Sequence, residues 1–333
     1  MSTISVVIPL YNEEGNVPEL ISRVSAIMKR ATLAQGDSYE ILAVNDGSRD
    51  GTLAALRAAR AQEPRLVIVD LSRNFGHQIA ATAGLDEARG DAVVLMDGDL
   101  QDPPELIEAF LEKWREGYDV VFATRKARRG ESAFKVLTAS VFYRTIRRLT
   151  NVSIPVDTGD FRLMSRRVVD ALGQTREKHR FLRGLVGWVG YRQIGVEYER
   201  DPRFSGETKY PFSKMLTFAI DGITSFSEIP LRFATYLGFT VSVFAFVYIV
   251  YVLVQKALGA NEPGYTSIMV ALLFLGGVIL ISLGIIGEYL GRIYDQVKLR
   301  PLYLLSSVER GSAAPPDVDV PSPARSEPAS ISP

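Results

Sequence analysis

Two long apolar runs constrain this chain more than any other feature. Residues 233–254 and 268–287 contain no charged side chain, and each run is about 20 residues long. As helices rising about 1.5 Å per residue, each would cross the roughly 30 Å hydrocarbon core of a bilayer. Buried helices of soluble proteins normally keep a polar stripe, which neither run has. The runs therefore predict two membrane-spanning helices joined by a short linker.

The distribution of charge predicts how such a hairpin is oriented. Arg232 precedes the first run, and Arg292, Lys298 and Arg300 follow the second. Positive charge favours the cytoplasmic side, so both large ends of the chain are expected in the cytoplasm. Over the whole chain, 38 Lys and Arg balance 38 Asp and Glu, which argues against a nucleic-acid partner. The absence of cysteine excludes thiolate metal sites and cysteine nucleophiles.

The first 230 residues alternate between apolar strands and amphipathic helices. Strands are expected at 4–10, 40–44, 66–71 and 92–96, and helices at 16–30, 52–62 and 78–88. Continuous apolar strands separated by helices predict an α/β fold, with a mostly parallel sheet covered by helices on both faces. Ligands of such sheets bind at the carboxyl ends of the strands.

Polar clusters follow three of the expected strands. Residues 9–14 read Pro-Leu-Tyr-Asn-Glu-Glu, residues 45–50 read Asn-Asp-Gly-Ser-Arg-Asp, and residues 97–102 read Asp-Gly-Asp-Leu-Gln-Asp. No Gly-x-Gly-x-x-Gly follows the first strand and no P-loop is present, which disfavours dehydrogenases and P-loop ATPases. These clusters predict a carboxylate-rich site on a nucleotide-binding scaffold.

Asp97, Asp99 and Gln101 are the candidate metal ligands. Their two-residue spacing would place all three side chains on one face if the extended geometry of the strand continued. Mg²⁺ and Mn²⁺ prefer such oxygen ligands and often bridge protein carboxylates to a diphosphate. An isolated Asp-x-Asp is more often a solvated turn. Here the motif follows a parallel strand beside two other polar strand ends, which strengthens the prediction of a metal site.

Together with Arg73-Asn-Phe-Gly76, these motifs resemble the family 2 glycosyltransferases of GT-A fold. Within that family they are most similar to the polyprenyl-phosphate glycosyltransferases, which include dolichyl-phosphate mannose synthases and bacterial GtrB-type undecaprenyl-phosphate glucosyltransferases. The resemblance covers about residues 4–300. The paired late runs and the segment Thr158-Gly-Asp-Phe-Arg-Leu163 favour the GtrB-type group.

The resemblance implies roles for the strand-end residues. The nucleotide pocket would be lined by Pro9, Tyr11, Glu13, Asp46 and Asp97. Asp46 would accept a hydrogen bond from the base, expected to be uracil, although Asp-Gly-Ser is also typical of a simple Asx turn. The metal, Mg²⁺ or Mn²⁺, would be held by Asp97, Asp99 and Gln101. Relatives often carry Lys at the position of His77, so no catalytic role is assigned to His77.

Asp157 matches the position of the acceptor-side carboxylate in the family, and the resemblance implies that it acts as a general base. A phosphate monoester has a second pKa near 6, so it is largely ionised at pH 7 and needs little proton abstraction. Asp157 would then position groups instead of taking a proton. Asp160 is the second candidate for this role, and for both residues the alternative is a turn before Phe161.

Two further segments carry the residues expected to bind phosphates. Residues 125–148 hold eight Lys or Arg against one Glu around an apolar stretch, which favours a basic amphipathic helix at the headgroups over a solvated basic face. Arg125 and Lys135 are its candidates for the lipid phosphate. Residues 200–210 resemble the family's mobile loop, in which Arg200, Ser205 and Lys209 would close over the pyrophosphate and exclude water; a flexible linker is the alternative.

The resemblance also implies a division of the chain. We expect a cytoplasmic GT-A catalytic domain at 1–210, interfacial amphipathic helices at 211–232, two transmembrane helices within 233–290 and a juxtamembrane segment at 291–306. Residues 307–333 are rich in Pro, Ser and Ala and predict a disordered tail. Short hairpins often gain stability by packing together, which favours a homo-oligomer, a dimer or a tetramer.

The implied activity is inverting transfer of a hexose, with glucose favoured, from a UDP-sugar to undecaprenyl phosphate at the bacterial inner membrane. Mannose, N-acetylhexosamine and modified arabinose remain alternative sugars. A processive polysaccharide synthase fits less well, because Gln-x-x-Arg-Trp is missing and two spans are few for a polymer channel. An ion channel is disfavoured by spans without internal charge, while a non-catalytic nucleotide-binding scaffold stays open.

Overall fold

The computed structural model describes residues 1–33, 35–125, 158–178, 180–198, 229–258 and 264–311. The chain forms two compact units. Of the described residues, those up to 198 and those from 301 onward belong to the first unit, and the helical residues 229–300 belong to the second. The first unit confirms the predicted α/β class.

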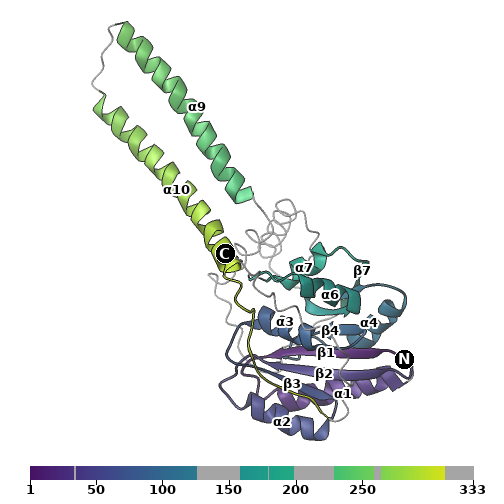
Figure 1. Ribbon diagram of the computed structural model, residues 1–333. Coiled ribbons are helices and arrows are strands. Elements are labelled where there is room, and N and C mark those ends of the chain that lie inside the picture. Colours follow the sequence, from purple (N-terminus) through teal and green to yellow (C-terminus); the bar gives the residue numbers. More distant parts are fainter. Residues whose placement is uncertain (34, 126–157, 179, 199–228, 259–263, 312–333) are drawn as a thin grey trace, which may run out of the picture. The chain divides into compact units, whose positions relative to one another are not determined.

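Four parallel strands form the centre of an eight-stranded sheet (Figure 1). They are β1 (Thr3–Leu10), β2 (Ser38–Asn45), β3 (Leu66–Leu71) and β4 (Ala92–Leu95). They lie in the order β4-β1-β2-β3, so that Val7 of β1 is in register with Leu42 on one side and Leu95 on the other. These strands are buried on both faces, which explains why they read as uninterrupted apolar runs.

Beyond β4 the sheet continues with strands that the sequence analysis did not predict. They are β5 (Val120–Arg125), β6 (Thr158–Ser165) and β7 (Gln193–Tyr198), in the order β4-β6-β5-β7. Strand β6 is antiparallel to both β4 and β5, with Leu95 opposite Arg162. The start of β6, including Asp160, therefore lies at the edge where β4 ends. The alternative that Asp160 belongs to a turn is wrong.

The outermost strand on the β3 side of the sheet comes from the far end of the chain. Strand β8 (Leu305–Glu309) pairs antiparallel with β3, with Val69 opposite Val308. Because residues 307–309 belong to this strand, the predicted start of the disordered tail at 307 was wrong. The strand is short, and Ser306 and Ser307 within it carry little apolar signal.

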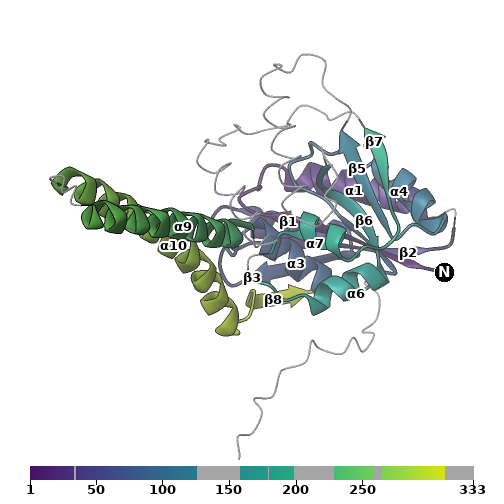
Figure 2. The ribbon, with the colours of Figure 1, turned by 90° about the horizontal axis from the view of Figure 1, so that it is seen from above.

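Helices cover both faces of the sheet, as predicted (Figures 1 and 2). One face carries α1 (Val17–Leu33), α2 (Thr52–Gln62) and α4 (Leu106–Arg115). The other carries α3 (His77–Glu87), α6 (Arg166–Gln174) and α7 (Leu182–Trp188). Successive side chains of β1 point to opposite faces of the sheet. Ile4, Val6 and Ile8 join the core beneath α1, while Val7 lies against Gly84 of α3.

The second unit contains two long helices that pack side by side, α9 (Ile229–Ala257) and α10 (Tyr265–Val297) (Figure 1). They contain the two predicted spans and extend beyond them at both ends. By length and composition, residues Val270–Val297 of α10 can cross a membrane. The apolar stretch found in α9, Ala234–Tyr248, is shorter, so a crossing by α9 stays a prediction.

Candidate active site

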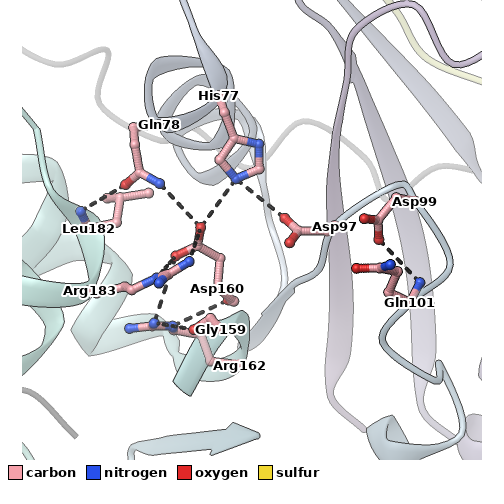
Figure 3. Close-up of polar contacts among 10 residues, drawn as sticks. All are labelled: His77, Gln78, Asp97, Asp99, Gln101, Gly159, Asp160, Arg162, Leu182 and Arg183. Carbon is pink, nitrogen blue, oxygen red and sulfur yellow. Dashed lines mark hydrogen bonds and ion pairs between the residues drawn. The ribbon is translucent and has the colours of Figure 1, made fainter. Parts of the chain in front are cut away.

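The turn after β4 carries the Asp97–Gln101 motif. Strand β4 ends at Leu95 and a turn begins at Gly98, so the extended geometry assumed for Asp97 and Asp99 does not continue. Leu100 is 3% exposed and adopts a left-handed backbone conformation with φ of +56°, which is rare for a branched residue. The backbone N–H of Gln101 donates to Asp99 Oδ1 at 3.1 Å. Asp97 instead points toward the start of α3 (Figure 3).

The ends of β1 and β2 place the expected nucleotide residues on the same side of the sheet. Pro9 is buried in β1, whereas Tyr11, just beyond it, is 41% exposed. Glu13 Oε2 accepts a hydrogen bond from Asn16 Nδ2 at 2.5 Å. The two strand ends are tied together where Asp46 N–H donates to the carbonyl oxygen of Leu10 at 2.9 Å.

The carboxylate of Asp46 holds the segment that follows β3. Its Oδ1 accepts from Phe75 N at 2.7 Å, and its Oδ2 accepts from Gly76 N at 2.9 Å. Burial raises the pKa of Asp46 more than these two hydrogen bonds lower it. Each carboxylate oxygen has a second lone pair, so this role leaves room for the predicted contact with a base.

A chain of alternating charges runs through the centre of the site (Figure 3). Arg183 of α7 donates through Nε to Asp160 Oδ1 at 2.7 Å and through Nη2 to Oδ2 at 3.2 Å. His77 Nε2 lies 3.3 Å from Asp160 Oδ2 and 3.3 Å from Asp97 Oδ1. The imidazole thus lies between two carboxylates, one just after β4 and the other in β6.

Gln78 strengthens the same junction between α3, β6 and α7. Its side-chain amide donates to Asp160 Oδ2 at 3.2 Å, and its side-chain oxygen accepts from Leu182 N at 3.0 Å. On the other side, the buried Arg162 donates to the carbonyl oxygen of Gly159 at 2.9 Å. Asp160 is therefore fixed from several directions.

The environment shifts the pKa values of these groups in opposite directions. Burial, supported by the charges of Asp160 and Asp99 among others, raises the pKa of Asp97 to about 6, although His77 opposes the shift. Burial would also raise the pKa of Asp160, but the hydrogen bond with His77 and the charge of Arg183 hold it well below its usual range. The pKa of His77 is raised, because these carboxylates outweigh the opposing effect of burial.

The surroundings of Asp97 suit a divalent cation. The possible ligand atoms of His77, Asp97 and Asp160 all lie within 4.8 Å of one another. Asp97 Oδ1 is buried and accepts no hydrogen bond from the described part of the chain. A buried carboxylate oxygen without a donor, beside further carboxylates, is an environment that favours a bound cation.

Several predicted site residues lie outside the described residues. These are Asp157, Lys135, Arg200, Ser205 and Lys209. Arg125 ends β5, and the structure describes its backbone but not its side chain. The roles expected of all six stay predictions.

His77 was expected to have no catalytic role, and Gln78 and Arg183 were not predicted. A signal for the first two was present, because a helix that follows a parallel strand begins at the carboxyl edge of the sheet, where the site was expected. Arg183 gave no such signal, because its helix, α7, is short and follows a strand that was not predicted.

Comparison with known proteins places this fold and site in a family. The family profile "Glycosyl transferase family 2" matches residues 5–173, and the profile "GtrB C-terminal hairpin" matches residues 229–293. The chain belongs to glycosyl transferase family 2, and the protein is a glycosyltransferase with a mostly parallel α/β sheet.

Individual relatives match over nearly the whole chain. An uncharacterised glycosyltransferase of Synechocystis is 52% identical over 92% of this chain and 95% of its own. An uncharacterised glycosyltransferase of Bacillus subtilis is 50% identical over 90% of this chain and 92% of its own. The SfII prophage-derived bactoprenol glucosyl transferase of Shigella flexneri is 40% identical over 93% of this chain and 99% of its own.

Proposed function

We propose that this enzyme transfers glucose from UDP-glucose to undecaprenyl phosphate, which is bactoprenol phosphate, with inversion at the anomeric carbon. The observation that carries the proposal is the 40% identity to bactoprenol glucosyl transferases, which extends through the apolar hairpin. The acidic strand-end site provides the second support, because it suits a metal-bound diphosphate.

Transfer to a lipid phosphate needs little help from a general base. An oxygen of the lipid phosphate would attack the anomeric carbon, while the bond from that carbon to the β-phosphate of UDP breaks and UDP leaves with the electron pair. Since the second pKa of a phosphate monoester is near 6, the attacking oxygen is already largely ionised at pH 7. Asp157, the predicted acceptor-side carboxylate, would then position the phosphate.

Asp160 is poorly suited to take a proton. Its carboxylate is paired with Arg183 and its pKa lies well below the usual range, so protonating it would break a buried ion pair. We therefore assign Asp160 a structural role in the site.

Mg²⁺ or Mn²⁺ would stabilise the negative charge that develops on the departing UDP. Asp97, Asp99 and Gln101 would hold it, while Pro9, Tyr11, Glu13 and Asp46 would bind the nucleotide. The phosphates of lipid and nucleotide would be met by Arg125, Lys135, Arg200, Ser205 and Lys209.

The lipid acceptor requires a membrane location. We propose a multi-pass protein of the bacterial inner membrane, with the catalytic unit in the cytoplasm. The apolar helix α10 and the basic residues Arg292, Lys298 and Arg300 after its apolar part support this orientation.

The test is turnover by the full chain in detergent. Undecaprenyl phosphate is supplied with Mn²⁺ and with one radiolabelled donor at a time, namely the UDP-linked forms of glucose and N-acetylhexosamine, a mannose donor and a modified-arabinose donor. We expect label in the organic phase with UDP-glucose alone, abolished by EDTA and strongly reduced in Asp157→Asn. Asp170→Asn is the matched control, because the Asp170 side chain is 59% exposed and its helix, α6, follows the end of β6 that is farther from Asp160.

Two outcomes would overturn the proposal. If the lipid-linked label comes from another sugar nucleotide, the donor sugar is not glucose, although the lipid acceptor is still correct. UDP binding without lipid-linked label from any donor would favour a different acceptor or a non-catalytic scaffold.

A further inference from the structure

The histidine that begins α3 links two parts of the site that are otherwise separate. Asp97 follows β4, and Asp160 lies in β6, which runs antiparallel to β4. His77 Nε2 is 3.3 Å from a carboxylate oxygen of each. The same ring nitrogen faces both acceptors, as Figure 3 shows.

This geometry fixes the chemical role of Nε2. Ionised carboxylates are acceptors only, so the nitrogen between them must carry the hydrogen. Two carboxylates that approach one site repel each other, and a donor between them reduces that repulsion. His77 Nε2 therefore faces both carboxylates at 3.3 Å as an N–H group, and not as an acceptor.

The two carboxylates are not equally constrained. Asp160 is 3% exposed and is held by Arg183, by Gln78 and by His77 itself. Asp97 is more open, with 27% of its side chain exposed, and its Oδ1 accepts no hydrogen bond within the described residues. Asp160 is thus the fixed end of the chain of charges, and Asp97 is the end that is free to meet a ligand.

We propose that His77 is a positioning residue, which uses the Asp160–Arg183 pair as an anchor to hold the Asp97 carboxylate in the orientation that binds the metal–nucleotide diphosphate. The inference rests on the proposed role of Asp97 and does not depend on which sugar or acceptor is used. It assigns a task to Arg183 as well, because Arg183 holds the anchor in place through its two hydrogen bonds.

Calorimetry on the full chain in detergent tests this, with UDP titrated in the presence of saturating Mn²⁺. Removing a residue that orients a metal ligand typically costs about 10- to 100-fold in affinity, and we expect that loss in His77→Leu. His77→Lys restores a donor between the carboxylates but cannot bind a metal, because an ammonium has no lone pair. We expect it to recover most of the lost affinity.

A double mutant separates positioning from other roles. If His77 acts through Asp97, His77→Leu adds little to the loss already caused by Asp97→Asn. Fully additive losses would overturn the proposal, as would wild-type affinity in His77→Leu. A lysine variant as weak as the leucine variant would make His77 a metal ligand instead, which also overturns it.

Two controls keep the result interpretable. His77→Lys keeps a cation between the two carboxylates, so its thermal unfolding midpoint should stay close to the wild-type value, and the midpoint of His77→Leu is measured beside it. The KM for the lipid acceptor should stay unchanged while the KM for the sugar nucleotide rises. Because UDP binding is measured without sugar or lipid, a wrong assignment of either substrate leaves this test unaffected.

Discussion

The hydroxyl of Tyr303 donates a hydrogen bond to Asp86 Oδ2 at 2.8 Å, which joins two residues 217 positions apart in the sequence. Asp86 lies near the end of α3 and also pairs with Arg176 at 2.7 Å. Next to it, Arg310 bonds to Glu87 at 3.0 Å and lies 3.5 Å from the fully buried Glu40. The segment after α10 is thus held to the catalytic unit by side chains as well as by β8.

Tyr303→Phe should destabilise the catalytic unit, because it removes one of the donors to the Asp86 carboxylate. Hydrogen bonds to charged groups contribute about 1.5–3 kcal/mol, and the remaining pair with Arg176 should keep the loss near 1 kcal/mol. The measurement is the thermal unfolding midpoint in detergent. Tyr294→Phe, at an exposed position of α10, is the matched control and should change nothing.

Gly47→Ala should damage the nucleotide side of the site. Gly47 has φ of +61°, and a Cβ there would lie 2.3 Å from the backbone carbon of Arg73, in the segment that Asp46 holds. Gly36→Ala is the matched control, because Gly36 has φ of +66° and the added carbon would meet no atom of the described residues within 4 Å. The control should be destabilised only by the cost of the left-handed conformation, about 1–2 kcal/mol.

UDP affinity distinguishes the two glycines. We expect it to fall in Gly47→Ala and to stay at the wild-type value in Gly36→Ala. Equal affinities in both variants would show that the 73–76 segment does not contribute to the nucleotide site.

Gly84→Ala should destabilise the packing of α3 on the sheet. The added carbon would lie 2.3 Å from Val7 Cγ1 and 2.8 Å from Val44 Cγ2, and overpacking of this kind costs about 1–3 kcal/mol. In Gly173→Ala of α6 the added carbon meets none of the described atoms within 4 Å, and the change should stabilise its helix by up to about 1 kcal/mol. Opposite shifts of the unfolding midpoint are expected, and a stabilised Gly84→Ala would contradict the close approach.

Asp119 should make stability depend on pH. Its hydrogen bond with Arg167 lowers its pKa, further aided by Ser165 Oγ at 3.1 Å, against the opposing effect of burial. A carboxyl whose folded pKa is depressed stabilises the protein fully above its unfolded pKa, near 3.9, and loses that contribution as the pH falls through the folded pKa.

Asp119→Asn should therefore lower the unfolding midpoint at pH 7, by an amount that shrinks below about pH 4. Asp170→Asn, at an exposed carboxylate, should show neither effect. A difference that stays constant from pH 7 to pH 3.5 would mean that the charge of Asp119 does not contribute.

The parallel half of the fold could be predicted because each strand is buried on both faces and reads as an apolar run. Strand β6 could not be predicted, because Asp160 and Arg162 interrupt its apolar pattern. Both are buried only because they form hydrogen bonds: Arg162 donates to the carbonyl oxygen of Asp160, and the Asp160 carboxylate accepts from Arg183. Short β8 lacked a signal for the same reason, since Ser306 and Ser307 separate its few apolar residues.

The site was predictable to the extent that it lies at strand ends of the parallel half. Asp46 and Asp97 were found this way. The link from Asp97 through His77 to Asp160 depends on β6 running antiparallel beside β4, and no local pattern of residues encodes that pairing. Asp157 stays a prediction.

The pairing of β8 with β3 has a consequence for how the chain can thread a bilayer. Strand β3 precedes both long helices and β8 follows both, yet the two strands share one hydrogen-bonded ladder. Both must occupy the same aqueous compartment, so the chain between them traverses a bilayer an even number of times. An α10 that crosses the membrane therefore requires a return crossing, and among the described residues α9, packed beside it, is the segment that we expect to make it.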